Sequence, residues 1–518
     1  MNKKLKVKSE KLKLQVKVQN YLKRTWCEFR SHKTIHLSLF TILLISLFLR
    51  LFRLHELLGF WYDQGRDALV IWRLLNEGKF FLIGPVTGIE GIFLGPFYYY
   101  LIAPFYWLGR GNPVLVIAAL NWLAGGSLLL LYLVGKELFS RQVGLLAVLI
   151  YGFCFSVVTF SRWLANPQPL TLFGLLILFF LLKIYQGQEK FWPLIGLLVG
   201  LSLQIEAAGA IFFLPAILVF IIWRRKVIKS WRLILFGLLF FLTTLLSQII
   251  FNFRHGGILF TAFKKFLLAE SAFHLPPWQV LSSRLSTYYD VFFGGLFPSW
   301  GRGKFFSASL FGMLFVFFRK KLLGGEKNIL WFWLLIPLVG FLFYQGNFGY
   351  VWDYYFAGVL PVFVLLLAAL LGFLGNLGKL GKVIVLVFLS CFLWINGRRL
   401  IVYYKTGIGI TLRSQLWALD WIYQDAKGQE FNVDVYVPPV IPYAYDYLFK
   451  WYGKGKYHYE PLEKQVSLLY TLSEPDSQHP NLLADWLKRQ DSIGKVIRKD
   501  SYGDITVQRR ERLEISNF

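Results

Sequence analysis

A short stretch near the N-terminus, FWYDQGRDALVIW at residues 60–72, places two carboxylates and a guanidinium among large aromatic side chains. Asp63 follows the first long apolar run, where a carboxylate can be partly buried and still be reached from water. A carboxylate in that position could act as a general base toward a bound hydroxyl group. A simpler interpretation is that Asp63 only caps the helix that follows it. Capping accounts for Asp63 but not for Arg66 and Asp67, and the two interpretations are compatible.

Other polar residues stand at the ends of later apolar runs and could belong to the same site. Arginine suits a phosphate ligand, because the guanidinium can donate two parallel hydrogen bonds to its oxygens. Each residue alone is typical of a solvated helix end, but together they could enclose a polar cavity. These residues are Glu90, Arg162, Asn166, Gln204, Glu206, Asn252, Arg254 and His255, with more cations in FKKF (263–266) and RGK (302–304), for which interfacial anchoring is at least as good an explanation.

The elements that must position these residues are membrane-spanning helices. Of the 518 residues, 56% are hydrophobic and only 16% are charged, which is far too apolar for a soluble globular protein. The net charge of +27 does not indicate a nucleic-acid partner, because Lys and Arg lie in an N-terminal arm and in short connections. The three cysteines, Cys27, Cys154 and Cys391, are far apart in the chain and indicate neither a disulfide framework nor a zinc site.

The apolar runs predict a mainly α fold, a polytopic bundle of about eleven transmembrane helices. A span needs about 20 mostly apolar residues. The first run begins near His36 and lacks a cleavage pattern, so we expect it to remain as a membrane anchor. The predicted spans are 36–54, 113–134, 143–161, 169–185, 191–206, 207–223, 231–251, 305–319, 328–344, 354–375 and 381–396.

Lysine and arginine in short connections set the orientation, because they are retained on the cytoplasmic side of the membrane. We therefore expect a plasma (inner) membrane protein with a basic cytoplasmic arm at 1–35. Four basic connections fall on the same side, at 136–142, 223–232, 318–327 and 378–382. The segments left outside are 55–112, 161–169, 204–209, 252–304, 344–355 and everything after about 400.

Two segments of the first outer loop are expected to lie along the membrane surface. GPFYYYLIAPFYWLG (95–109) is short for a span and contains two prolines and several Tyr, among them Tyr98 and Tyr99. Counting it as a span would invert every later connection and put the basic ones outside. RDALVIWRLLNEG (66–78) also has the character of an interfacial helix.

The composition turns water-soluble after Asn396, which predicts a transmembrane domain at 36–398 and a soluble extracytoplasmic domain at 399–518. A small α/β fold is expected for the second domain. SQLWALDWIYQDAKG (414–428) has helical amphipathic spacing, and FNVDVYVPP (431–439) alternates like a strand. GKVIRKDSYGDITVQRRE (494–511) is typical of a hairpin.

One segment of the soluble domain, YAYDYLFKWYGKGKYHYE (443–460), is rich in Tyr, Trp and Lys. Its aromatic faces could stack on the sugar rings of an acceptor. A packed helix with a basic rim is the commoner meaning of such a run.

The order of these motifs resembles that of the GT-C membrane glycosyltransferases. The similarity is greatest to the branch related to protein O-mannosyltransferases and lipid A aminoarabinose transferases. The resemblance covers about residues 36–375. Beyond the arm and first span it rests on YDQGRDA (62–68), GPFYYYLIAPFYWLG (95–109) and FSRWLANPQPLTLFGLL (160–176).

The resemblance implies an inverting transferase that moves a sugar from a polyprenyl-phosphate donor to a protein, lipid or glycan acceptor outside the membrane. Relatives carry a D-E-x-R motif in the first external loop, which Asp63-Gln64-Gly65-Arg66 matches. Asp63 is thereby implied as the catalytic residue. Arg66, Arg162, Arg254 and His255 are expected at the donor phosphate or sugar, with Gln64, Asp67, Glu90, Tyr98, Tyr99, Asn166, Gln204 and Glu206 in supporting or acceptor-binding positions.

The chain departs from the family pattern at three places. Gln64 stands where many relatives have Glu, and Asn166 where an acidic residue follows the Arg. The stretch Gly95-Pro96-Phe97-Tyr98-Tyr99 lacks the basic residue and second proline often seen there. These departures leave the donor sugar open. No cofactor or metal ligand is predicted, and a divalent metal is kept only as an alternative.

The expected chemistry fits the residues. A hydroxyl is a poor nucleophile at neutral pH, so a carboxylate must take its proton during the attack, and Asp63 is the candidate. The leaving phosphate needs cations, each worth about 3 kcal/mol when well placed. A transporter or flippase would instead need polar groups along a path to both sides, and a non-catalytic scaffold would tolerate loss of Asp63.

Overall fold

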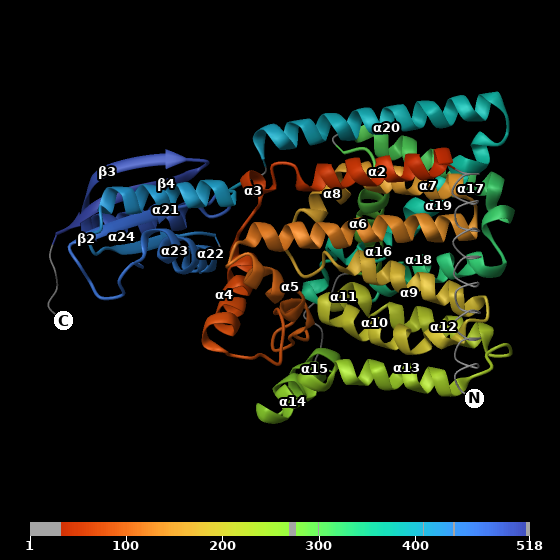
Figure 1. Cartoon of the computed structure of the whole chain (residues 1–518), viewed down its shortest axis with the longest axis horizontal. Coiled ribbons are helices and arrows are strands. Elements are labelled where there is room, and N and C mark those ends of the chain that lie inside the picture. The colour runs from red at the N-terminus through yellow and green to blue at the C-terminus, as the bar shows by residue number, and fades with distance from the viewer. Residues whose placement is uncertain (1–32, 269–275, 299, 408, 439–440, 514–518) are drawn as a thin grey trace, which may run out of the picture.

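The computed structural model describes residues 33–268, 276–298, 300–407, 409–438 and 441–513. Most of the predicted basic arm, with Cys27, lies outside the described residues. Figure 1 shows a bundle of long helices that run side by side, with a smaller sheet-containing domain beyond one end of the bundle.

Each of the eleven predicted spans contains a helix. Four helical stretches among the described residues are long and apolar enough to cross a membrane, and up to six if each of two bent pairs is one span. The number eleven therefore stays a prediction. The helices are α2 (Lys33–Leu51), α6 (Pro113–Leu138), α7 (Arg141–Phe153), α8 (Phe155–Ser161), α9 (Leu170–Tyr185), α10 (Trp192–Ile205), α11 (Ala207–Ala210), α12 (Phe213–Arg224), α13 (Trp231–Thr244), α14 (Leu246–Arg254), α15 (Ile258–Leu268), α16 (Pro277–Tyr289), α17 (Gly301–Leu322), α18 (Asn328–Phe341), α19 (Leu360–Gly375) and α20 (Lys379–Thr406), with short turns η1 (Glu189–Phe191), η2 (Asp290–Gly294), η3 (Gly325–Lys327), η4 (Asn347–Gly349) and η5 (Asp353–Phe356).

The centre of the bundle is α19, whose residues from Pro361 to Leu371 are buried without a break. A helix that is apolar on all sides is stable only when other helices surround it. Two predicted spans are bent: α7 meets α8 at 66°, and α13 meets α14 at 43°. The chain is an integral membrane protein.

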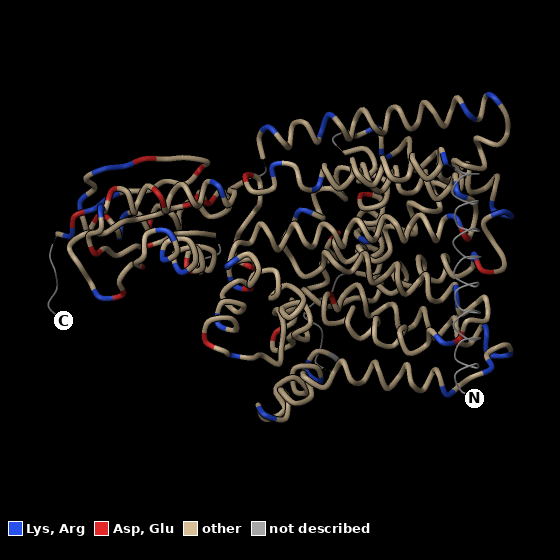
Figure 2. The backbone as a smooth tube through the Cα atoms, in the orientation of Figure 1, with Lys and Arg blue, Asp and Glu red and all other residues tan. Residues whose placement is uncertain are grey.

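The Lys and Arg residues of the bundle gather in large part at the end far from the sheet domain, as Figure 2 shows. This distribution agrees with the shared side that the sequence predicts for the basic connections. Which face of the membrane this end occupies stays a prediction.

Both predicted surface segments of the first loop are helical. They form α4 (Tyr62–Glu77) and α5 (Phe97–Leu108). Figure 1 places them at the end of the bundle that faces the sheet domain.

The C-terminal domain has the predicted α/β composition. Its four-stranded sheet has the order β1-β2-β4-β3, in which β1 pairs parallel with β2 and the other pairs are antiparallel. The predicted domain boundary at residue 398 falls within α20, which continues to Thr406. The elements are α21 (Leu412–Ala426), β1 (Asn432–Tyr436), α22 (Tyr443–Leu448), η6 (Phe449–Gly453), α23 (Lys454–Tyr457), β2 (Leu468–Ser473), α24 (Pro480–Ile493), β3 (Gly494–Tyr502) and β4 (Ile505–Arg512).

The C-terminal domain docks on the first loop (55–112) through α22 and α4. One hydrophobic core includes Phe60 and Tyr106 from the loop and Tyr447 from α22. The Tyr447 hydroxyl donates to the carbonyl of Gly111, and Trp451 Nε1 donates to that of Arg110 at 2.9 Å. The aromatic segment 443–460 is therefore a packed part of the domain interface.

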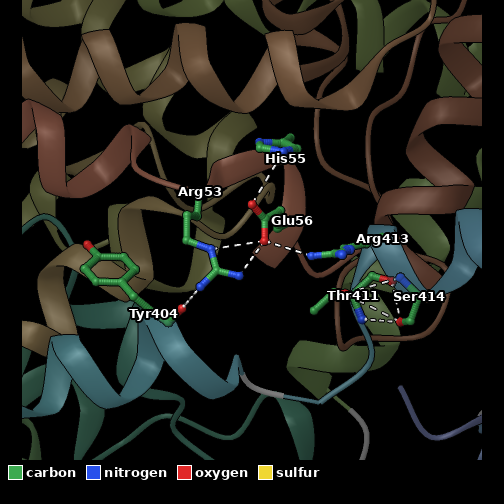
Figure 3. Close-up of polar contacts among 7 residues, drawn as sticks. All are labelled: Arg53, His55, Glu56, Tyr404, Thr411, Arg413 and Ser414. Atoms are coloured by element: carbon green, nitrogen blue, oxygen red, sulfur yellow. Dashed lines mark hydrogen bonds and ion pairs between the residues drawn. The ribbon is translucent and has the colours of Figure 1, made fainter. Parts of the chain in front are cut away.

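A polar cluster around Glu56 joins the same two parts of the chain (Figure 3). The Glu56 carboxylate accepts hydrogen bonds from Arg53 Nε at 3.0 Å and from Arg413 Nη1 at 3.0 Å. Arg53 also donates to the carbonyl of Tyr404. The cluster thus ties the short helix α3 (Leu54–Leu57) to the end of α20 and the start of α21.

Candidate active site

The helix that carries the DQGR motif begins earlier than the sequence predicted. Its capping residue is Trp61, whose N–H donates to Gln64 Oε1 at 3.0 Å. Asp63 is the second residue of α4 and not its cap. The interpretation of Asp63 as a simple capping residue is therefore wrong, because the helix starts at Tyr62 and not at Arg66.

Asp63, Arg66 and Asp67 form a chain of ion pairs on α4. Arg66 Nη1 lies 2.9 Å from Asp63 Oδ1, and Arg66 Nη2 lies 2.8 Å from Asp67 Oδ1. The Asp63 side chain is 55% exposed, whereas that of Asp67 is only 6% exposed. Asp63 is thus the carboxylate of the pair that solvent or a ligand can reach.

The buried carboxylate of Asp67 holds the Arg66 guanidinium in place. Its Oδ1 accepts hydrogen bonds from Arg66 Nε at 2.9 Å and from the Tyr99 hydroxyl at 2.9 Å. Burial raises the pKa of Asp67 to about 6, against the opposing effect of the Arg66 charge. Burial alone would lower the pKa of Arg66, but Asp67 and Asp63 outweigh it and the pKa is raised. Tyr98, from the same turn of α5, is buried beside this cluster.

Gln64 connects α4 to the junction between α8 and α9. It is 3% exposed, and its Nε2 donates to the carbonyl of Leu164 at 3.0 Å. An amide suits this position because its Nε2 donates to the Leu164 carbonyl while its Oε1 accepts from the Trp61 N–H.

A second group of predicted residues surrounds the break between α10 and α11. Gln204 Oε1 accepts from the N–H of Phe97 at 3.0 Å, and Asn166 Nδ2 donates to the carbonyl of Ile205 at 2.6 Å. Glu206 caps α11 by accepting from the N–H of Ala208 at 3.0 Å. The contact with α5 is close because residue 95 is glycine: a Cβ there would lie 2.3 Å from Gln204 Cδ.

Tyr354, on η5, links the two groups. Burial raises its pKa, and the carboxylates of Glu206 and Asp63 raise it further. Both carboxylates therefore lie within electrostatic reach of one hydroxyl group. The sequence interpretation placed the loop 344–355 outside but did not single out Tyr354. Its sequence could have pointed to Tyr354, because Asp353-Tyr354-Tyr355 places a carboxylate among aromatic residues, as the stretch around Asp63 does.

A cavity of about 290 Å³ opens beside Tyr354. Its walls come from the bent α7–α8 pair, from η2 and from the start of α19. Among its polar lining residues are Asp290 and Asp353. Lys304 Nζ lies 2.6 Å from Asp290 Oδ1, so one cation of the predicted RGK stretch is bonded to the cavity wall.

Arg162 does not join this site. Its Nη1 donates to the carbonyls of Arg50 and Phe52 at 2.8 Å each, and its Nε donates to the Tyr403 hydroxyl at 3.0 Å. The side chain is 3% exposed. The guanidinium thus holds the C-terminal end of α2 against α20, and its role as a phosphate ligand stays a prediction.

The remaining predicted residues lie at the surface. Arg254 is exposed at the end of α14, and the neighbouring His255 ring stacks on Phe251 at a centroid distance of 4.0 Å. Glu90 is 94% exposed and lies 3.6 Å from Lys265 Nζ. Their contact with a donor therefore stays a prediction.

The described residues contain no group of three or more His, Cys, Asp or Glu side chains that could hold a metal ion. At the DQGR motif itself, the second acidic position is the amide Gln64, and the Asp67 carboxylate is occupied by Arg66 and Tyr99. These groups of the motif are thus already bonded within the protein, and a divalent metal stays the alternative that the sequence left open.

Comparisons with known proteins agree with the helical membrane fold described above. Residues 94–251 match the family model described as dolichyl-phosphate-mannose-protein mannosyltransferase. No curated protein matches the chain by sequence.

Two solved structures resemble the chain over nearly its whole length. Apo ArnT from Cupriavidus metallidurans superposes with a TM-score of 0.60 at 11% identity, over 92% of this chain and 98% of that one. The same protein bound to undecaprenyl phosphate gives 0.57 at 13% identity, over 91% and 97%. At these identities the likeness shows a common fold.

Proposed function

This chain has the GT-C fold of the membrane glycosyltransferases related to ArnT and to the protein mannosyltransferases, and from that premise we propose a transfer reaction. The donor is a sugar on a polyprenyl phosphate, the acceptor is a hydroxyl group outside the membrane, and the anomeric configuration is inverted. Undecaprenyl phosphate in the ArnT structure supports a lipid phosphate as the donor class.

Asp63 is the general base of this proposal. One observation carries it: Asp63 is the exposed carboxylate of the cluster, with a side chain that is 55% exposed and held by Arg66 at 2.9 Å. The acceptor O–H proton passes to Asp63 as the oxygen bonds to the anomeric carbon. The bond from that carbon to the phosphate oxygen breaks, and the polyprenyl phosphate leaves. Such proton transfer contributes about 10²–10⁴-fold to a rate.

Arg66 orients this base. Its guanidinium is shared by two carboxylates, so its charge is largely compensated before a phosphate arrives. Asp67 and Tyr99 fix the guanidinium from the buried side, and the guanidinium in turn fixes Asp63.

The donor sugar and phosphate occupy the cavity beside Tyr354. Asp290 and Asp353 can accept hydrogen bonds from sugar hydroxyls, and Lys304 supplies a cation at the wall. Arg254, at the end of α14, and His255, directly after it, are further candidates for contact with the phosphate. The polyprenyl chain lies in the bilayer between helices, which explains why the enzyme is embedded in the membrane.

The test is a transfer assay with the full-length protein in lipid nanodiscs. A panel of radiolabelled polyprenyl-phosphate sugars is incubated with envelope extracts, and wild type is compared with Asp63→Asn. Wild type should transfer label from at least one donor, and Asp63→Asn should lower the rate by about 10²–10⁴-fold.

The matched control is Glu430→Gln, an exposed carboxylate of the C-terminal domain. It should transfer at the wild-type rate. Equal transfer by Asp63→Asn, or no transfer from any donor, would contradict the proposal. In sealed proteoliposomes, transport of the lipid-linked sugar across the bilayer without transfer would indicate a flippase instead.

A further inference from the structure

A second cavity, of about 300 Å³, lies where the C-terminal domain meets the start of α4. Its walls include Trp61 and Tyr62 from the first loop, Gln415 from α21, Tyr445 from α22, Glu474 after β2, and Asp504 from the turn between β3 and β4. The volume is at the lower end of the roughly 300–1,000 Å³ typical of small-molecule sites. The cavity is therefore large enough for one ring-sized group.

The polar atoms that the cavity offers are mainly hydrogen-bond acceptors. Glu474 and Asp504 contribute carboxylates, and Tyr445 already donates its hydroxyl to Glu474 at 2.7 Å. Gln415 is 1% exposed and uses Nε2 to donate to the carbonyl of Phe60 at 2.8 Å. Its Oε1 has no hydrogen-bond partner among the described residues. A buried acceptor without a partner costs about 1–3 kcal/mol.

The charge of the cavity limits the ligand further. The described residues that line it include two carboxylates and no Lys, Arg or His. Phosphate or carboxylate groups would be repelled there, whereas at the first cavity, also lined by two carboxylates, Lys304 forms an ion pair with Asp290 and compensates its charge. A suitable ligand carries hydroxyl groups and no negative charge.

Flat apolar surfaces form the other walls. The Trp61 and Tyr62 rings lie on the side of the first loop, with Pro442 and Pro475 on the side of the C-terminal domain. Aromatic faces pack well against the C–H face of a sugar ring, while the ring's hydroxyl groups point to acceptors at its edge.

The position of the cavity relates it to the candidate base. Tyr62 immediately precedes Asp63 in α4, and the charges of Asp63 and Arg66 both act on the Tyr62 hydroxyl. Asp63 is therefore next in the chain to a residue that lines this cavity, and its charge also acts on Tyr354, which lines the first cavity. A base between donor and acceptor needs this arrangement.

We propose that the cavity between α4 and the C-terminal domain is the acceptor subsite and binds an uncharged, hydroxyl-rich sugar ring of a glycan acceptor. This assignment rests on the proposed transferase function. It names the acceptor as carbohydrate, with Glu474 and Asp504 accepting from its hydroxyl groups and Trp61 and Tyr62 stacking on its ring.

The test measures binding without turnover. The full-length protein in nanodiscs is examined by saturation-transfer difference NMR with neutral manno-, gluco- and galacto-oligosaccharides, a phosphorylated oligosaccharide and a Ser/Thr-rich peptide. At least one neutral oligosaccharide should bind. The double variant Glu474→Gln/Asp504→Asn should weaken that binding at least tenfold, while Glu430→Gln should leave it within twofold of wild type.

The double variant keeps the local structure. Gln can still accept the Tyr445 hydrogen bond, and Asn tolerates the positive φ of 66° at residue 504. An unfolding temperature equal to that of wild type verifies that the double variant is folded. Absence of binding by any neutral oligosaccharide, equal binding by the double variant, or stronger binding of the phosphorylated ligand or the peptide overturns the proposal.

The two proposals fail separately in these experiments. Asp63→Asn should bind the neutral oligosaccharide as wild type does, because Asp63 does not line this cavity. If Asp63→Asn loses transfer and still binds the oligosaccharide, the acceptor subsite stands. If the double variant transfers sugar with an unchanged acceptor KM, the acceptor subsite is wrong and the transferase function stands.

Discussion

Gly65 lies directly against the backbone of Ala444. A Cβ at position 65 would come within 2.3 Å of the Ala444 nitrogen, closer than any side chain can be placed. The glycine of the DQGR motif therefore serves the contact between α4 and α22. The candidate catalytic residues and the docking surface of the C-terminal domain are consequently on the same helical turn.

Gly65→Ala should separate the two parts of the chain at this contact. We expect a lower apparent unfolding temperature, faster proteolysis between α20 and α21, and at least about tenfold lower transfer, because misplacement of a site by about 1 Å has effects of this order. Limited proteolysis and the transfer assay measure these changes. Gly397→Ala is the control, since nothing lies within 4 Å of a Cβ there. Equal behaviour of the two variants would contradict the close contact.

Asp67 should make stability depend on pH. Its folded pKa is raised from 3.8 to about 6 by burial, so the folded state holds this proton more tightly than the unfolded state. The free energy of unfolding should therefore fall as pH rises through that window and level off above it. Asp67→Asn lacks this contribution. Apparent unfolding temperatures of the two proteins, measured from about pH 4 to 7, should differ most in slope below about pH 6, and parallel curves would refute the assignment.

Gln64→Glu should destabilise the protein although relatives carry Glu at this place. The Gln64 amide donates to the buried carbonyl of Leu164, and a carboxylate would face that oxygen instead. The loss should be at least about 1–3 kcal/mol near neutral pH, the cost of leaving buried groups unpaired. Chemical denaturation measures it. Gln188→Glu, at an exposed position, provides the control and should be near neutral.

Arg162→Lys should affect folding and not donor binding. A lysine cannot reproduce the guanidinium's bonds to the carbonyls of Arg50 and Phe52 and to the Tyr403 hydroxyl. We expect a loss of about 1–3 kcal/mol in stability. The donor KM of the folded fraction should stay within about twofold of wild type. A large rise in donor KM with unchanged stability would place Arg162 at the phosphate site.

The parts of the site that could be predicted from sequence are local in the chain. Asp63, Arg66 and Asp67 are within one turn of a helix, where residues three apart face each other. The helical segments followed from apolar runs because the bilayer forces backbone groups to pair within a segment. The hairpin at 494–511 followed from alternation around a glycine turn in the same way.

The direction of long side chains could not be predicted. Arg162 is at the C-terminal end of α8, and only the packing of α2 and α20 decides that its guanidinium turns into the bundle. Tyr354 was missed for a related reason. Its relevance comes from the approach of η5 to Glu206 and Asp63, which are more than a hundred residues away in sequence. The two cavities likewise arise from segments that no short motif connects.

The length of α20 has a mechanical consequence. Its 28 residues extend about 42 Å at 1.5 Å per residue, whereas the hydrocarbon layer is about 30 Å thick. The surplus of about 12 Å is comparable to the roughly 10–15 Å that the two headgroup layers add to the hydrocarbon core. One unbroken helix is therefore long enough to carry the chain through the core and both headgroup layers to the C-terminal domain, whose first helix, α21, begins at Leu412.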